Sequence, residues 1–371
     1  MLAARHFLLA GAVVLLLVGA SYARGAAAES SPSYISAIQV DPKRPTVIYA
    51  GAGHHGVLKS ADGGRTWSAA NEGLTVPRGS PPNSAPPGSP PGVVRVDTLA
   101  LDARAPNIVY AGTGLGVFKT TDGARTWKLA SSGITFFGSS LRHRLAEGSI
   151  YGLSIDPLHP STVYAAGFGG VWKTTNGGAS WKRVLREDVF NVGIDPRRPR
   201  TVYAAGVRWQ SRTHRESIYK TVDGGGTWRA SGPPGLHDNY FGHPIVVDRR
   251  RAGMIYAGGS RGLFLSANQG GTWTKALALR KAFSGVNAIA LDPVRVSVLY
   301  VGTSTRGVMK SVDAGQTWST PRLDGRRRGV SALAIARTRP QTIYAGVYEV
   351  GPGSARMFAS TDGGATWRRL F

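Results

Sequence analysis

One octapeptide occurs seven times in this chain of 371 residues, and the repetition restricts the possible folds more than any other feature. Each copy begins with Ser or Thr, carries Asp or Asn at its third position and ends with Trp. The copies span residues 60–67, 120–127, 174–181, 221–228, 266–273, 311–318 and 360–367. The tryptophans that end successive octapeptides lie 60, 54, 47, 45, 45 and 49 residues apart, which is the length expected for one four-stranded blade of a β-propeller.

Each octapeptide follows three segments with the pattern of strands. The first alternates apolar and polar residues, as in Ile38 and Val40 before Asp41, and a period of two indicates a strand with one buried face. The second is a Val/Ile-Tyr-Ala-Gly element, the third is short and apolar, and a fourth begins at each Trp. We therefore predict an all-β fold: a single seven-bladed β-propeller over residues 34–371, with four antiparallel strands per blade and the octapeptide in the turn between the third and fourth strands.

The octapeptides have a structural interpretation. An Asp or Asn in a tight turn accepts hydrogen bonds from nearby backbone amides, glycine supplies a positive φ, and Trp buries a large apolar surface. Seven equivalent copies indicate architecture rather than catalysis. We assign this structural role to Asp62, Trp67, Asp122, Trp127, Asn176, Trp181, Asp223, Trp228, Asn268, Trp273, Asp313, Trp318, Asp362 and Trp367.

The ends of the repeat region predict how the ring closes. The last octapeptide ends at Trp367 and leaves only residues 368–371 for a final strand, while the first blade begins near Tyr34. Each blade is then one contiguous repeat. Closure is expected to depend on face packing between blades 7 and 1, with no strand shared between the two ends.

The first 28 residues have the features of an export signal. Arg5 and His6 precede an apolar stretch over residues 7–18, and small residues follow. A single anchoring helix is the alternative, although the stretch is short for a membrane span. The chain contains no cysteine, so we expect neither disulfides nor a lipid-modified cysteine. The expected destination is the periplasm or the outside of the cell.

The chain is strongly basic, with 45 Lys and Arg against 21 Asp and Glu. We expect no nucleic acid as partner, because the protein is exported and carries no nucleic-acid-binding module. Acidic protein partners, anionic polysaccharides or peripheral contact with an anionic membrane fit the charge better. Arg scattered through every repeat also fits a bias of genome composition, and both interpretations stay open. The Pro/Ser/Gly-rich insertion over residues 76–92 is predicted to be a flexible spacer, with partner binding as the alternative.

Candidate binding residues come from long loops on one face of the predicted propeller. This upper face is formed by the turns between second and third strands and by the connections between blades. Arg offers planar donors for carboxylate or phosphate, and aromatic rings offer stacking surface. The candidates are Arg208, Trp209, Arg212, His214, Arg215, Tyr240, His243, Arg326, Arg327 and Arg328. The alternative is that these loops are merely solvated.

Catalytic and metal chemistry find little support in the sequence. Adjacent His54 and His55 have no carboxylate at metal-ligand spacing, so we predict no metal and no cofactor. A glycosidase needs two carboxylates across a cleft. Asp97, Glu147, Asp188, Asp238 and Glu349 are expected near the upper face, but the sequence pairs no two of them. The expected oligomeric state is a monomer.

The octapeptides resemble the Asp-box, or BNR, repeat of sialidases, sortilin-type receptors, xyloglucan-cleaving endoglucanases and photosystem II stability and assembly factors. The resemblance covers about residues 34–371. Such sialidases carry an Arg-Ile-Pro element, which is absent here, and usually six blades. The xyloglucan enzymes join two seven-bladed propellers around a catalytic cleft, whereas this chain supplies one. The assembly-factor type is most similar and implies an exported, non-catalytic scaffold that binds a protein or an anionic polymer. The alternative is a sialidase-like or xyloglucanase-like glycoside hydrolase acting on extracellular glycans.

Overall fold

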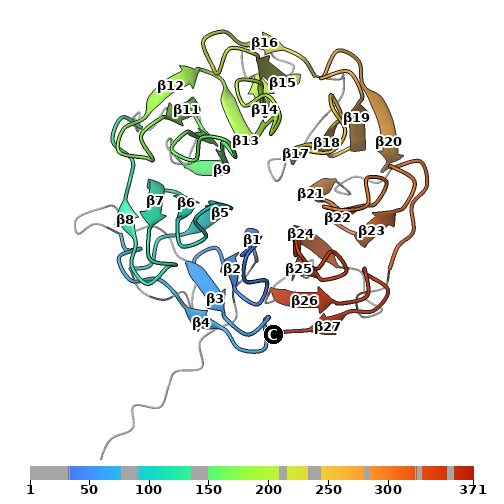
Figure 1. Ribbon diagram of the computed structural model, residues 1–371, viewed down its shortest axis with the longest axis horizontal. Coiled ribbons are helices and arrows are strands. Elements are labelled where there is room, and N and C mark those ends of the chain that lie inside the picture. The colour runs from blue at the N-terminus through green and yellow to red at the C-terminus, as the bar shows by residue number, and fades with distance from the viewer. Residues whose placement is uncertain are drawn as a thin grey trace, which may run out of the picture.

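The computed structural model describes residues 32, 34–76, 90, 92–134, 149–208, 215–232, 244–279, 285–321, 323, 328–348 and 355–371. Seven antiparallel sheets are arranged around a common axis, and Figure 1 shows them in chain order around the ring. The prediction of a seven-bladed β-propeller is confirmed. The described residues contain no helix long and apolar enough to cross a membrane.

Each sheet is a meander of consecutive strands. Blades 1 to 4 consist of β1 (Ala37–Val40), β2 (Ile48–Gly51), β3 (Val57–Ser60) and β4 (Ser68–Ala69); β5 (Val96–Leu101), β6 (Val109–Thr113), β7 (Gly116–Thr120) and β8 (Lys128–Leu129); β9 (Ile150–Ile155), β10 (Val163–Gly167), β11 (Gly170–Thr174) and β12 (Lys182–Leu185); β13 (Asp188–Ile194), β14 (Val202–Arg208), β15 (Arg215–Thr221) and β16 (Arg229–Ala230).

Blades 5 to 7 continue the pattern with one exception. They consist of β17 (Ile245–Val247), β18 (Ile255–Gly259), β19 (Gly262–Ser266) and β20 (Thr274–Ala278); β21 (Val286–Leu291), β22 (Leu299–Thr303) and β23 (Gly307–Ser311); β24 (Gly329–Ile335), β25 (Ile343–Tyr348), β26 (Arg356–Ser360) and β27 (Arg368–Arg369). In blade 6 the fourth strand is reduced to a bridge between Lys310 and Ser319. Pro321 follows closely, and proline cannot donate to a ladder.

Burial changes from the inside of each blade to its rim. The first strand of every blade lies nearest the axis (Figure 1), and second strands such as β6, β10 and β22 are buried along their whole length. The outermost strands β4, β8, β16 and β27 are two residues long and exposed. Short outer strands leave little unpaired edge, which protects an open sheet from pairing with other chains.

The octapeptides form the turns between third and fourth strands, as predicted. In blade 1, Asp62 Oδ1 accepts hydrogen bonds from the backbone amides of Arg65 and Thr66 at 2.9 and 3.0 Å, and the Thr66 hydroxyl donates to Oδ2 at 2.6 Å. The two glycines that follow, Gly63 and Gly64, have φ of 77° and 86°. Hydrogen bonds from Thr66 hold the pKa of the Asp62 carboxyl well below its ordinary value.

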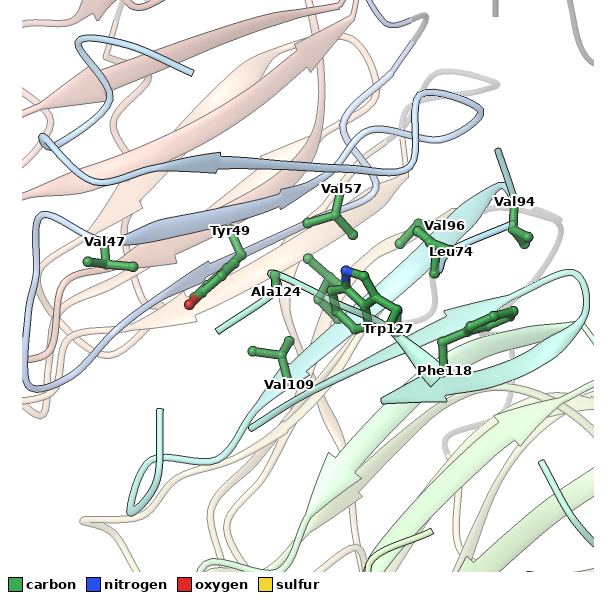
Figure 2. Close-up of a cluster of buried hydrophobic side chains, with 12 residues drawn as sticks. Val47, Tyr49, Val57, Leu74, Val94, Val96, Val109, Phe118, Ala124 and Trp127 are labelled. Carbon is green, nitrogen blue, oxygen red and sulfur yellow. The ribbon is translucent and has the colours of Figure 1, made fainter. Parts of the chain in front are cut away.

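The octapeptides also connect neighbouring blades, beyond the local role predicted for them. The indole N–H of Trp127 donates to the carbonyl oxygen of Ala70 in blade 1 at 2.8 Å, and that of Trp181 donates to Ala130 in blade 2 at 2.7 Å. Trp273 and Trp318 reach the preceding blade in the same way. Figure 2 shows Trp127 packed among apolar side chains of blades 1 and 2, including Val57 and Leu74.

A second contact between blades uses the Tyr of the second strand and a Lys of the third. In blade 3, the Tyr164 hydroxyl and Lys173 Nζ both donate to the carbonyl oxygen of Gly224 in the next octapeptide, at 3.0 and 2.9 Å. We call this arrangement the Tyr–Lys clasp. It occurs in blades 1, 2, 3, 4 and 6, where the Tyr and Lys pairs are Tyr49 and Lys59, Tyr110 and Lys119, Tyr164 and Lys173, Tyr203 and Lys220, and Tyr300 and Lys310.

Blades 7 and 1 meet face to face, and each remains a separate contiguous sheet, as predicted. Ile35 and Ile38 pack with Tyr344 and Met357 in one buried cluster. The Ser331 hydroxyl donates to the Ile35 carbonyl oxygen at 2.6 Å. The C-terminal end lies beside β4 in Figure 1. The ring is therefore closed mainly by apolar contact.

Candidate functional site

The upper face contains a structural irregularity that repeats around the axis. Five innermost strands shift register by one residue near their upper ends, so that one residue of each has no partner on the second strand. The skipped residues are Asp97, Tyr151, Phe190, Asn287 and Ser331. Such β-bulges re-aim a side chain, and they are common at barrel rims and beside binding sites.

The equivalent positions differ in chemistry although the strands around them are alike. Aligned on the second strands, Ser36 takes the position in blade 1, and His243, the blade 5 equivalent, lies outside the described residues. In the aligned sequences of blades 1 to 7 the position is thus Ser, Asp, Tyr, Phe, His, Asn and Ser. A scaffold alone does not require this variety, so we take these positions as candidates for recognition.

In blades 6, 7 and 1 the bulge position fastens neighbouring blades together. The Ser36 hydroxyl donates to the Val96 carbonyl oxygen at 2.9 Å, and Asn287 Nδ2 donates to that of Val330 at 3.1 Å. Ser331 makes the matching contact to Ile35. Each bond crosses to the next blade, so these three side chains are occupied by structure.

Blades 1 and 2 hold an ion pair beneath a tyrosine. An Arg95 terminal nitrogen lies 2.6 Å from Asp97 Oδ1, and the Tyr34 hydroxyl donates to the same oxygen at 3.1 Å. Arg95 Nε donates to the Tyr34 hydroxyl at 3.0 Å. Burial raises the pKa of Asp97, while Arg95 and Tyr34 lower it, and burial with the Asp97 charge raises the pKa of Tyr34. About a third of the Arg95 side chain, 32%, remains exposed, against 6% of Asp97.

Three aromatic rings lie beside this ion pair in blades 3 and 4: Tyr151 is partly exposed, whereas Phe168 and Phe190 are only 5% and 7% exposed. Tyr151 and Phe168 meet edge to face with ring centres 5.4 Å apart, and Phe190 lies 5.8 Å from Tyr151 and 5.4 Å from Phe168. The strand β5, which carries Asp97, packs against β9, which carries Tyr151, so the ion pair and the rings are neighbours. Burial raises the pKa of Tyr151, and the Asp97 charge raises it further. We call Tyr34, Arg95, Asp97, Tyr151, Phe168 and Phe190 the upper arc.

A histidine borders the upper arc. His54 lies in the β2–β3 turn, and its pKa is lowered by burial and by the charges of Arg95 and His55. Among the described residues no group of three His, Asp or Glu side chains is placed to hold a metal ion.

The carboxylates of Asp97 and Asp188 both accept hydrogen bonds. Asp97 Oδ1 is engaged by a guanidinium and a phenol, and Asp188 Oδ1 accepts a hydrogen bond from the Gly169 amide at 2.7 Å. The anchored Arg95 offers hydrogen-bond donors, and the partly exposed Tyr151 ring beside it offers an apolar contact.

The residues predicted for this face stand as follows. Trp209, Arg212, His214, Tyr240, His243, Arg326 and Arg327 lie outside the described residues, as do Glu147, Asp238 and Glu349. Arg208 and Arg215 pair in the β14–β15 ladder, and their side chains are not described. Arg328 differs from the exposed cationic tip that we expected: it is 2% exposed and stacks over the Phe358 ring at 6.0 Å.

The sequence held a signal for the upper arc that loop length did not reveal. When the seven repeats are aligned on Tyr-Ala-Gly, the residue type varies at one first-strand position, which is that of Asp97, two residues before the apolar Leu99, in blade 2. Asp97 was considered only as one carboxylate among several. Tyr34, Arg95, Tyr151, Phe168 and Phe190 were missed because they lie within or beside regular strands.

Comparison with known families decides the chain's relationship. Residues 112–370 match the family model described as Photosynthesis system II assembly factor YCF48. The chain belongs to this family. Among solved structures, YCF48 bound to a D1 peptide has a TM-score of 0.58 at 13% identity, covering 89% of this chain and 94% of that one.

Enzymes are also similar to this YCF48-family chain. Xyloglucanases of Hypocrea jecorina (strain QM6a) and Paenibacillus sp. are 29% identical over 126 residues and 24% identical over 275 residues. These matches cover 34% and 60% of this chain, but it spans only 15% and 26% of those two relatives. The GH74 xyloglucanase structure from Xanthomonas campestris has a TM-score of 0.67 at 16% identity, covering 92% of this chain and 55% of that one. At such identities the structural likeness shows a shared fold.

Proposed function

We propose that this protein is an exported, non-catalytic scaffold whose upper arc binds an extended segment of a protein partner. The observation that carries the proposal is the set of equivalent first-strand positions around the axis on the upper face, five of which are β-bulges. It places different side chains at equivalent positions and joins the Arg95–Asp97 pair to three aromatic rings. Family membership supports the proposal, and the related YCF48 structure holds a D1 peptide.

The chemistry of the arc defines the expected partner segment. Arg95 is fixed by Asp97 and Tyr34, so it can donate to a carboxylate or a backbone carbonyl with little loss of side-chain entropy. The Tyr151 ring is partly exposed above the buried Phe168 and Phe190, so it can contact an apolar or aromatic side chain of the partner. The segment should therefore combine an acceptor group with an apolar residue a few positions away.

Binding to a defined peptide library tests the proposal. Fluorescence anisotropy is measured for extended peptides in which one carboxylate and one aromatic residue are placed at varied spacing. The double variant Arg95→Gln/Asp97→Asn removes the ion pair without leaving a buried charge unpaired. It and Tyr151→Ala should each weaken the best peptide by at least roughly 10-fold.

Arg306→Gln is the matched control, because Arg306 is an exposed arginine of the upper face in blade 6, outside the arc. It should leave the affinity unchanged. Unchanged affinity in both arc variants would refute the proposed site. Export is tested separately, by sequencing the N-terminus of the protein recovered from the periplasm or medium, where cleavage is expected within or just after residues 1–28.

A glycoside hydrolase is the second candidate, since two sequence relatives are xyloglucanases. Asp97, Glu187 and Asp188 are upper-face carboxylates of the described residues that are available to such a reaction. Release of reducing ends from xyloglucan, abolished by Asp97→Asn or Asp188→Asn, would favour the hydrolase. No release beside peptide binding would favour the scaffold.

A further inference from the structure

The lower face, opposite the upper arc, carries a ring of cations. It is formed by the turns from first to second strands and by the octapeptides. Every one of the seven first-to-second turns contains Lys, Arg or His. Because first strands lie nearest the axis, these turns surround the axis on the lower face (Figure 1).

Carboxylates neutralise only part of this ring. In six turns a buried Asp accepts hydrogen bonds from backbone amides within the turn, as Asp41 does from Lys43 and Arg44. Four of these Asp also pair with the Arg three residues later, as Asp292 does with Arg295 at 2.6 Å. Eight further cations of these turns make no ion pair within the described part of the chain: Lys43, Arg104, Arg197, Arg200, Arg249, Arg250, Arg337 and Arg339.

These cations are exposed and close to one another. Arg197 donates to the carbonyl oxygens of Arg249 and Arg250 at 3.1 and 2.7 Å, which joins the turns of blades 4 and 5. Burial lowers the pKa of Arg249, and the charge of Arg337 from the blade 7 turn lowers it further. The first-to-second turns of the lower face therefore hold more Lys and Arg than Asp, and these cations come from separate blades.

Exposed apolar side chains gather on the same face. Among the described residues the large apolar side chains that stay exposed are Leu129, Leu158, Val222, Val294, Val296 and Val312, at 43–62%. All except Leu129 lie in lower-face turns. Val294 and Val296 flank Arg295 in the β21–β22 turn, and Leu158 precedes His159 in the β9–β10 turn. A soluble polyanion attracts the cations but gives these apolar groups nothing to enter.

We propose that the lower face docks on an anionic lipid bilayer, with its cations at the headgroups and Leu158, Val294 and Val296 at the acyl boundary. Basic residues together with projecting apolar ones characterise surfaces that bind in the plane of a membrane interface. Docking in this way turns the upper arc away from the membrane. The inference is independent of which partner the arc binds.

Vesicle sedimentation with the full-length protein tests the charge component. The protein should bind phosphatidylglycerol-containing vesicles and bind pure phosphatidylcholine vesicles much less. Raising the ionic strength from about 0.1 to about 1 M shortens the Debye length from about 10 to about 3 Å and should release it. The triple variant Arg104→Glu/Arg249→Glu/Arg337→Glu should bind at least roughly 100-fold more weakly.

The matched control is Arg186→Glu/Arg261→Glu/Arg306→Glu, which changes the net charge equally through exposed arginines of the upper face. It should retain most of the vesicle binding. The N-terminal apolar stretch is present in every sample and contributes equally. Equal losses in the two triple variants would show that only net charge matters, and would overturn the proposal.

An environment-sensitive dye tests the apolar component and the orientation. Because the chain has no cysteine, Val294→Cys creates a single labelling site in a lower-face turn, and Arg261→Cys creates one in the β18–β19 turn of the upper face. On anionic vesicles the dye at position 294 should brighten and shift to the blue, while the dye at 261 should not. Binding to vesicles and to a soluble polyanion alike, with no shift at 294, would show a polyanion site instead.

Discussion

The Tyr–Lys clasp makes a quantitative prediction about how adjacent blades hold together. In blade 3, Tyr164 and Lys173 donate to one buried acceptor, the Gly224 carbonyl oxygen, and Lys173 Nζ lies 5.4 Å from the centre of the Tyr164 ring. Tyr164→Phe removes one donor and Lys173→Met removes the other. Each single variant leaves the carbonyl with a partner, whereas the double variant removes both.

The expected losses follow from the cost of hydrogen bonds. Tyr164→Phe should lower the free energy of unfolding by about 1 kcal/mol, and Lys173→Met by about 1.5 kcal/mol, because its donor is charged. The double variant also leaves a buried carbonyl without these donors, which costs about 1 to 3 kcal/mol more. We therefore expect a double-mutant cycle with a coupling free energy of about 1 kcal/mol or more, beyond simple addition.

Urea unfolding followed by tryptophan fluorescence measures the effect, with midpoints compared at constant m-value. Tyr344→Phe in blade 7 is the matched control. Tyr344 is 3% exposed and occupies the equivalent position, but Ala359 stands in place of the Lys. The Tyr344 hydroxyl makes no hydrogen bond among the described residues. Tyr344→Phe should change the free energy of unfolding by less than about 0.5 kcal/mol. Additive losses in blade 3, or a Tyr344→Phe loss as large as that of Tyr164→Phe, would refute the reasoning.

Three further predictions concern the turns. Ala314 has a φ of 64°, so Ala314→Gly should raise the free energy of unfolding by about 1 kcal/mol. Ala365→Gly, in an octapeptide position without positive φ, should lower the free energy of unfolding. Chemical denaturation measures both changes. Hydrogen bonds from Thr317 lower the pKa of Asp313 to about 2, so its contribution to stability is present above its ordinary pKa of about 4 and is lost as the pH falls toward 2. Asp313→Asn should therefore reduce the fall in Tm over that pH interval, and an unchanged fall would contradict this. A Cβ at Gly73 would lie 2.2 Å from a backbone oxygen of blade 2, so Gly73→Ala should cost about 2 kcal/mol or more. Gly92→Ala, with nothing within 4 Å, should cost only about 1 kcal/mol of backbone strain in the same assay.

The repeats predicted the architecture because each turn contains its own interactions. The hydrogen bonds of the Asp62 carboxylate and the positive φ of Gly63 depend on neighbours within a few positions. Periodicity then fixed the number of blades and the contiguity of each sheet. Interactions within one repeat can therefore be predicted from the sequence of that repeat.

Interactions between blades were less accessible to sequence. Trp127 was expected to stabilise its own hairpin, yet its indole N–H donates to Ala70, 57 residues earlier. Arg328 looked like the end of an exposed basic run, but it is buried over Phe358. In both cases the decisive partner belongs to another strand or blade, and its distance in sequence gives no local signal. The upper arc was missed because its members lie within or beside regular strands of four blades, where loop length gives no signal.

The seam between the first and last blades has a consequence for synthesis of the protein. A Cβ at Gly64 would touch Leu370 at 2.7 Å, and Trp67 meets the Phe371 ring edge to face at 5.7 Å. The earliest sheet to leave the ribosome thus has one face that only the latest residues can cover. Until then that face is open to chaperones or to other nascent chains, so ring closure is a late step that protects the newly made protein from misassociation.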